Sequence, residues 1–310
     1  MDNASIERYR AAESLLWAEA GWEPDEQWVD FREGRIRVLS SGTGEPVVFV
    51  HGGPNAGSTW SRLAGLLSDR FRVIVMDRPG CGLSDPLSMP ADMPPDEWWQ
   101  VMGDMVGAVV DGCADGPAHV VASSYGGACA LALASASQQR VERLVLQGTP
   151  ALDGMKAPMN MRMLGAGPIG RFIARQKATR GSTRMTFRQI GHKRLVASGW
   201  PQGADLEWGL AMMNDTDTMR NEVDLIQRAA TWRGFRKGWL LDPGALGSVK
   251  ARTLWIAGDS EPFASAEMLQ AWSSAIPDSR LVVRPGCGHL PWMDEPEGNA
   301  AMVAEFLSAD

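Results

Sequence analysis

Short apolar runs alternate with helical stretches along most of the chain, and this alternation constrains the fold more than any other feature. Segments such as VVFV, VIV and LVL are apolar on both faces, so both faces must be covered. Helical patterns separate these runs, which predicts a mostly parallel, eight-stranded α/β sheet with helices on both sides. The predicted strands are Gln27–Phe31, Arg35–Leu39, Pro46–Val50, Phe71–Asp77, Ala118–Ser123, Val141–Gln147, Arg252–Gly258 and Ser279–Arg284.

The stretch from about residue 150 to residue 245 lacks this strand alternation. Helical sequence rich in methionine and arginine takes its place, so we predict a helical cap over 150–245. The core would comprise 1–149 and 246–310, with an N-terminal helical extension over about 1–25.

Between residues 154 and 204 there are ten Lys or Arg and no Asp or Glu. Such a run either forms a solvated helix face or attracts an anionic substrate. The methionines either form the cap's own small core or line a roomy apolar pocket.

The composition argues against several classes of protein. A formal net charge of −7 disfavours a nucleic-acid binder that relies on bulk charge. No run of about 18 apolar residues exists, so no membrane span is expected, and the N-terminal residues lack a signal-peptide pattern. The four cysteines have no CxxC spacing, and no two histidines have metal-ligand spacing. We expect a cytoplasmic monomer or homodimer that needs no metal or cofactor and binds a small-molecule substrate.

The predicted strand that ends at Ser123 runs directly into a helix through the sequence ASSYG, residues 122–126. A small-x-Ser-x-Gly sequence in this context predicts a nucleophile elbow, a turn so tight that only small residues fit beside the serine. The turn would strain the backbone of Ser124 and point its hydroxyl out above the sheet. The helix that follows would aim free N–H groups and its positive dipole end at the same place. Ser124 is therefore the candidate nucleophile.

A serine hydroxyl is a weak nucleophile and needs a base that is itself oriented by an acid. His289 lies in a glycine-rich loop after the last predicted strand, which suits the base. His119 begins a strand and His192 lies in the basic cap, so both are weaker candidates. The acid should follow the preceding strand, where GDSEPF offers two carboxylates, Asp259 and Glu261.

The segment His51-Gly52-Gly53-Pro54 follows the predicted strand Pro46–Val50. An oxyanion needs two preorganised N–H donors, each worth about 3–4 kcal/mol when removed. We predict that the N–H groups of Gly53 and Tyr125 supply them, because glycine lets the backbone approach the substrate closely. We expect His51 to support this loop through hydrogen bonds.

At this point the sequence resembles the α/β-hydrolase family, of the serine-nucleophile type with a helical cap after the sixth strand. The resemblance covers roughly residues 27–150 and 246–308 and rests on HGGP, DRPGCGLSD, ASSYG, GDSEPF and GHLPWMDEP. It implies the chain order nucleophile, acid, histidine. It also implies that the acid stands three residues past the glycine of GDSEPF, which selects Glu261. Members of the family more often have Asp at this position, and Asp259 remains the alternative.

The resemblance implies a cofactor-independent hydrolase that cleaves a carboxylic ester, lactone or thioester. Hydrolysis of a carbon–carbon bond in a vinylogous diketone acid, of the meta-cleavage-product type, is the alternative, and the basic cap would suit such a carboxylate. The HGGP and GCG segments also resemble proline iminopeptidases, but the residues around Ser124 differ from theirs. A serine nucleophile argues against dehalogenases and epoxide hydrolases. The non-enzymatic alternative is a small-ligand receptor on the same fold.

Two tryptophans close to the motifs, Trp60 and Trp292, are candidates for lining the pocket.

Overall fold

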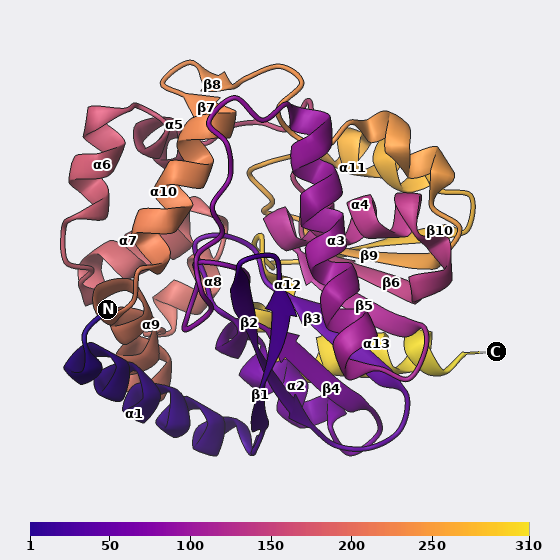
Figure 1. The fold of residues 1–310 in the computed structure, drawn as a ribbon, viewed down its shortest axis with the longest axis horizontal. Helices are drawn as coiled ribbons and strands as arrows, with labels where there is room; N and C mark the ends of the chain where they lie inside the picture. Colours follow the sequence, from indigo (N-terminus) through magenta and orange to yellow (C-terminus); the bar gives the residue numbers. More distant parts are fainter. Residues whose placement is uncertain (310) are drawn as a thin grey trace.

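The computed structural model describes residues 1–309 and contains a twisted sheet of eight strands (Figure 1). Their order is β1-β2-β4-β3-β5-β6-β9-β10, with β1 and β2 antiparallel to their neighbours and the others parallel. The predicted eight-stranded, mostly parallel sheet is therefore confirmed. The strands are β1 (Asp25–Phe31), β2 (Gly34–Ser41), β3 (Pro46–Val50), β4 (Arg72–Met76), β5 (Ala118–Ser123), β6 (Val141–Gln147), β9 (Arg252–Gly258) and β10 (Ser279–Arg284).

Alternate residues of each central strand enter two separate apolar cores, one on each face of the sheet. In β3, Val48 and Val50 pack into one core, while Val47 and Phe49 pack into the other. The first core is covered by α3 (Pro95–Cys113), α4 (Ser124–Ala136) and α11 (Ala266–Ala275). The second is covered by α2 (Ser61–Leu67), α12 (Pro291–Asp294) and α13 (Pro296–Ser308). Coverage on both faces explains why these strands are apolar throughout.

Six α-helices, a 3₁₀ helix (Pro243–Ser248) and a short hairpin lie between β6 and β9, and we call residues 148–251 the cap segment. Its helices lie to the left of the sheet in Figure 1. The division of the chain at 149/150 and 245/246 stays a prediction. The elements of the cap segment are α5 (Met159–Leu164), α6 (Pro168–Ala174), α7 (Arg180–Gln189), α8 (Lys193–Ala197), α9 (Gly203–Asp215), α10 (Thr218–Ala229), β7 (Ala230–Thr231) and β8 (Gly234–Phe235).

The N-terminal helix α1 (Asn3–Ala20) packs along α9 of the cap segment (Figure 1). Tyr9 and Leu16 share an apolar cluster with Trp208 and Met212. The sequence predicted this helix but not its contact with the cap segment, because the two are separated by almost 200 residues. The helix therefore joins the cap segment to the first strands of the sheet.

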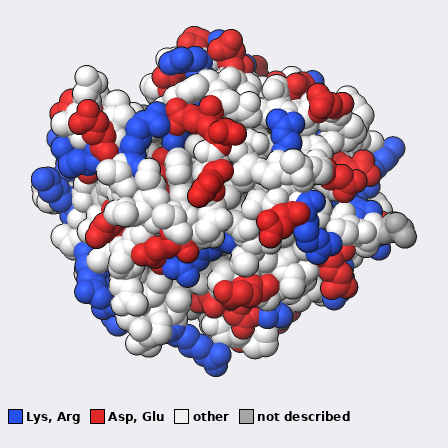
Figure 2. Space-filling model, turned by 90° about the horizontal axis from the view of Figure 1, so that it is seen from below, with Lys and Arg blue, Asp and Glu red and all other residues white. Residues whose placement is uncertain are grey.

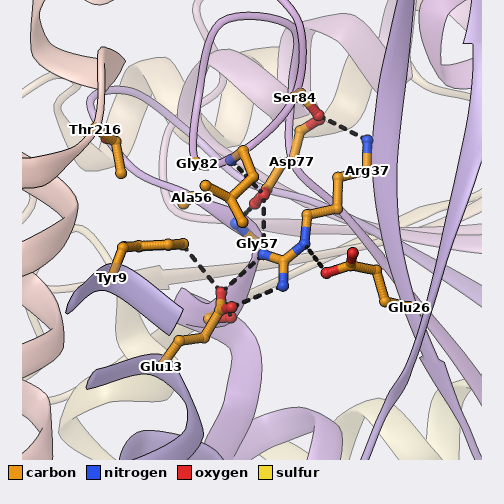
Figure 3. A network of polar contacts seen from close by, with 12 residues as sticks. Tyr9, Glu13, Glu26, Arg37, Ala56, Gly57, Asp77, Gly82, Ser84 and Thr216 are labelled. Atoms are coloured by element: carbon orange, nitrogen blue, oxygen red, sulfur yellow. Dashed lines mark hydrogen bonds and ion pairs between the residues drawn. The ribbon is translucent and has the colours of Figure 1, made fainter. Parts of the chain in front are cut away.

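A buried network of charged groups holds α1, the first strands and two loops together (Figure 3). The guanidinium of Arg37 on β2 contacts Glu13 of α1 at 2.7 Å and Asp77, directly after β4, at 3.4 Å. Asp77 in turn accepts hydrogen bonds from the backbone N–H groups of Gly57 at 2.6 Å and Leu83 at 3.1 Å. These bonds fix the loops that follow β3 and β4 at the carboxyl ends of the strands.

No helix within residues 1–309 is both long enough and apolar enough to cross a membrane. On the face shown in Figure 2, basic and acidic side chains are interspersed over the surface. Mixed charge of this kind differs from the single basic surface through which many nucleic-acid binders attract phosphates.

Replacing Glu13 by Ala tests the network. The variant leaves the buried guanidinium of Arg37 with one fewer carboxylate, and breaking a buried ion pair typically costs about 3–5 kcal/mol. We expect a loss of this size in the free energy of unfolding, measured by urea denaturation. Glu7→Ala removes an exposed carboxylate from the same helix and is the matched control. A loss below about 1 kcal/mol in Glu13→Ala would contradict this account.

Candidate active site

Ser124 lies at the junction of β5 and α4, in the left-handed region of backbone conformation with φ of 51°. This region is uncommon for residues other than glycine and marks a strained turn. The turn packs against the loop after β3: the N–H of Gly52 donates to the hydroxyl of Ser123 at 3.1 Å. At Gly126 any side chain would collide with the carbonyl oxygen of His51. The local structure thus requires a small residue where the motif has one.

His289 lies directly opposite the buried carboxylate of Glu261. Its Nδ1 atom is 2.9 Å from Oε1 and 2.8 Å from Oε2 of that carboxylate. The backbone N–H groups of Thr149 and Phe263 donate to the same two oxygens, each at 3.1 Å. Asp259, the other candidate acid, is exposed and bonds to the neighbouring Ser260. The structure therefore places Glu261, and not Asp259, beside the candidate base.

The electrostatics of this pair favour an ionised acid. Burial by itself raises the pKa of Glu261, but the adjacent His289 and the hydrogen bonds to the carboxylate outweigh it and lower the pKa overall. In the neutral imidazole the Nδ1–H then donates to Glu261, which leaves the lone pair on Nε2. That Nε2 atom is buried without a hydrogen-bond partner in the described part of the chain. A neutral imidazole with a free Nε2 lone pair can accept a proton, and no hydrogen bond joins this atom to the hydroxyl of Ser124 in the described part of the chain.

The loop after β3 carries the two glycines expected to form half of an oxyanion hole. His51 is fully buried, and its Nδ1 atom lies 2.7 Å from the carbonyl oxygen of Gly52. Burial, followed by the charge of Arg78, lowers the pKa of His51 well below its ordinary value, so the ring is neutral. Gly53 and Tyr125 both line the cavity that contains Ser124. The backbone N–H of Tyr125 lies in the first turn of α4, where helix N–H groups have no partner within the helix.

A cavity of about 730 Å³ lies between the carboxyl ends of the strands and the cap segment. Its wall is mostly apolar and includes Ser124, His289 and Trp292, together with the cap-segment methionines Met155, Met161, Met163, Met212, Met213 and Met219. Met212 and Met219 also belong to apolar clusters that include cap helices, so both interpretations of the methionines hold in part, while Met159 and Met185 are exposed. Of the basic stretch between residues 154 and 204, Lys177 lines the cavity.

The two candidate tryptophans stack on each other, with ring centroids 4.0 Å apart and an angle of 24° between planes. Trp292 borders the cavity, although only 1% of it is exposed, and Trp60 is completely buried. Both tryptophans belong to the same apolar core.

Two buried side chains of the cap segment reach the candidate site. The sequence analysis did not name Glu222, and it considered His192 only as a weaker candidate for the base. Glu222 of α10 contacts Arg78 beside the glycine loop. His192 bonds to Asp294 at 2.7 Å and accepts the N–H of Leu290 at 3.2 Å, next to the candidate base. Neither lies in a recognisable motif, because each meets its partner only through the folding of the cap segment over the sheet.

The chain resembles known proteins in both sequence and fold. It matches the family model of the alpha/beta hydrolase fold over residues 45–296. It is 25% identical to a 2-hydroxy-6-oxo-6-phenylhexa-2,4-dienoate hydrolase from Burkholderia cepacia, over 88% of this chain and 91% of that protein. It is also 25% identical to haloalkane dehalogenase 2 from Mycobacterium tuberculosis, over 91% and 94% of the two chains. Its fold resembles a carboxylesterase from Bacillus subtilis, with a TM-score of 0.72, 19% identity and coverage of 98% and 99%.

Replacing Glu261 by Gln tests the electrostatics of the pair. Because the pKa of Glu261 is lower in the folded protein than its ordinary value of 4.5, the unfolded state binds more protons in acid. The carboxylate therefore stabilises the fold above about pH 4.5, and this contribution is lost as pH falls through the folded pKa. We expect the difference in free energy of unfolding between wild type and Glu261→Gln to shrink as pH is lowered below about 4.5.

Urea denaturation at a series of pH values measures this difference. Asp259→Asn removes an exposed carboxylate from the same loop and controls for the loss of one negative charge. A difference between wild type and Glu261→Gln that does not change with pH would contradict the assignment.

Proposed function

Because the chain belongs to the α/β hydrolase fold family, we propose that it is a serine hydrolase that cleaves a carboxylic ester, lactone or thioester through an acyl-enzyme. One observation carries the proposal. His289 is bonded through Nδ1 to a buried carboxylate and keeps a buried Nε2 that has no hydrogen-bond partner among the described residues, while Ser124 lines the same cavity on a strained turn. This combination of residues provides a nucleophile, a base and an orienting acid.

In the proposed reaction, Ser124 Oγ attacks the acyl carbonyl while His289 Nε2 takes the hydroxyl proton. The N–H groups of Gly53 and Tyr125 donate to the oxygen that becomes negative. His289 returns the proton to the leaving alkoxide or thiolate, and the acyl group stays on Ser124. Water then attacks the acyl carbonyl, with His289 as base, and the tetrahedral adduct collapses to release the carboxylic acid and the free serine. Glu261 stabilises the imidazolium that forms twice in the cycle.

The cavity supports an apolar acyl or alcohol group. Several methionines line it, and such flexible side chains adapt to substrates of different shape. The volume of about 730 Å³ lies within the usual range for small-molecule sites. We therefore propose a medium-sized apolar ester as the substrate class.

Hydrolysis of a carbon–carbon bond is the second candidate, favoured by the names of several relatives. One is the dienoate hydrolase of Burkholderia cepacia, and another is a 2-hydroxy-6-oxononadienedioate/2-hydroxy-6-oxononatrienedioate hydrolase from Comamonas testosteroni. Lys177 at the cavity wall would attract the carboxylate of such a substrate. The same serine, histidine and acid would act in this reaction.

Replacing Ser124 by Ala tests the nucleophile. We expect turnover of p-nitrophenyl esters, from acetate to octanoate, to fall by about 10⁴-fold or more, because no acyl-enzyme forms. Ser135→Ala deletes a hydroxyl from the same helix and should keep full activity. Turnover that survives in Ser124→Ala, or folded wild type that hydrolyses no ester of the series, would overturn the esterase proposal. The absence of ester turnover together with ligand binding would favour a receptor.

Replacing Lys177 by Ala distinguishes the two candidates. For a carboxylate-bearing dienoate we expect KM to rise about two- to fivefold, the size expected for one exposed charge, with no change for a neutral ester. Steady-state kinetics on both substrates measure this effect. Lys193→Ala removes an exposed lysine of the cap segment outside the cavity wall and serves as the matched control. Dienoate turnover that does not respond to Lys177→Ala would remove the argument for a carboxylate site there.

A further inference from the structure

A buried ion pair joins the cap segment to the loop that follows β4. Arg78 Nη2 lies 2.5 Å from Oε1 of Glu222, which comes from α10. Both side chains are only 4% exposed. The thiol of Cys81 donates to the same carboxylate oxygen at 3.3 Å. Neither charged residue has a part in the proton transfers described above, yet burying two charges is costly. The burial of this ion pair therefore needs a structural or functional explanation.

The guanidinium of Arg78 is bound mainly to the glycine loop after β3. Its Nε donates to the carbonyl oxygen of His51 at 3.0 Å, and its Nη2 donates to that of Gly52 at 3.1 Å. The backbone N–H of Arg78 donates to His51 Nε2 at 3.0 Å. The carbonyl oxygen of Gly52 thus has two donors, Arg78 and the ring of His51.

These bonds determine the direction of the Gly53 N–H. The carbonyl of Gly52 and the N–H of Gly53 belong to one peptide unit, and in the described chain the cis bonds lie elsewhere, at Gly53-Pro54 and Trp200-Pro201. In a trans peptide the C=O and N–H groups point in opposite directions. With its carbonyl held by Arg78 and His51, the peptide must direct the Gly53 N–H away from them. A cation at the carbonyl also polarises the peptide and strengthens the N–H as a donor.

Glu222 also lies close to Gly53, where a Cβ atom would meet the side chains of both Glu222 and Arg78. A side chain at Gly53 would collide with Oε2 of Glu222, so glycine is required for the carboxylate to reach Arg78. Without this carboxylate the guanidinium would be a buried, uncompensated charge, free to turn away from the two carbonyls. The cap segment therefore supplies the counter-ion that keeps Arg78 on the glycine loop.

We propose that Arg78 is a positioning residue that orients the Gly52–Gly53 peptide as an oxyanion donor, and that Glu222 of the cap segment holds Arg78 in that position. The inference rests on the proposed function, since it concerns the oxyanion of the same reaction. It also means that the oxyanion hole is complete only when α10 is packed over the loop. The cap segment then contributes to the rate of the reaction as well as to the shape of the pocket.

Arg78→Lys is the principal test. Lysine keeps the positive charge, but it lacks the planar guanidinium whose fixed N–H groups donate to the two carbonyls and to Glu222 at once. We expect kcat on a p-nitrophenyl ester to fall by about 10- to 100-fold, which at most equals the loss seen when an oxyanion donor is removed. We expect KM to stay within about twofold of the wild-type value. An alkyl boronic acid forms a tetrahedral adduct with the serine and places an oxygen in the oxyanion hole. We expect its affinity to fall by the same factor as kcat/KM, because both depend on the Gly53 donor.

Glu222→Gln is the second variant, since it keeps the shape of the side chain while removing the counter-charge, and we expect a smaller loss in the same direction. Thr218→Val is the matched control. Thr218 also lies on α10, is fully buried, and accepts the N–H of Gly82 at 2.9 Å, so it fastens the same helix to the same loop without touching the glycine loop. We expect this variant to lower the free energy of unfolding and to leave kcat and boronate affinity unchanged.

The outcomes separate the inference from the proposed function. The inference alone would be overturned if the wild type shows Ser124-dependent turnover while a folded Arg78→Lys or Glu222→Gln variant keeps the wild-type kcat and boronate affinity. Equal losses in Thr218→Val and Arg78→Lys would also overturn it, because they would indicate general loosening of the cap segment. Wild type that shows neither Ser124-dependent turnover nor boronate binding would overturn the proposed function and the inference together.

Discussion

The close approach between the loop after β3 and the turn after β5 is the constraint on which the candidate site depends. The two strands are adjacent and parallel, with Val50 opposite Ala122, so their carboxyl ends meet at one edge of the sheet. The loop lies so near the turn that position 126 has no room for a side chain. This packing brings the strained serine and the glycine loop close together. The other groups of the site are arranged around that contact.

Paired charges hold the surrounding loops in place. Two buried ion pairs join segments that are distant in sequence, Arg37 with Glu13 and Arg78 with Glu222, and a buried hydrogen bond joins His289 to the carboxylate of Glu261. Each charged group is expensive to bury alone, and removal of one partner leaves the other uncompensated. The pairs therefore make the relative position of α1, the strand-end loops and the cap segment specific in a way that apolar packing does not. The wall of the cavity is mostly apolar, whereas buried polar contacts hold the loops around it.

The fold class could be predicted because strand and helix periodicity are local properties of the chain. All eight strands were located to within one or two residues at their ends, and the family was recognised from short motifs around the strand ends. The candidate nucleophile, base and acid were named for the same reason, since each follows a strand at a characteristic distance. The choice between Glu261 and Asp259 needed a resemblance, because both lie in one loop and differ only in the direction of their side chains.

The sequence by itself determined the sheet, the order of the candidate site residues along the chain and the position of the strained turn, because each depends on residues close together in the chain. Only the tertiary structure decided which distant groups meet them. It placed Trp292 at the border of the cavity and Trp60 in the buried core, and it brought Glu222 to Arg78 from 144 positions along the chain. No local pattern encodes such contacts, since they arise when the cap segment packs over the sheet and buried charges must find partners.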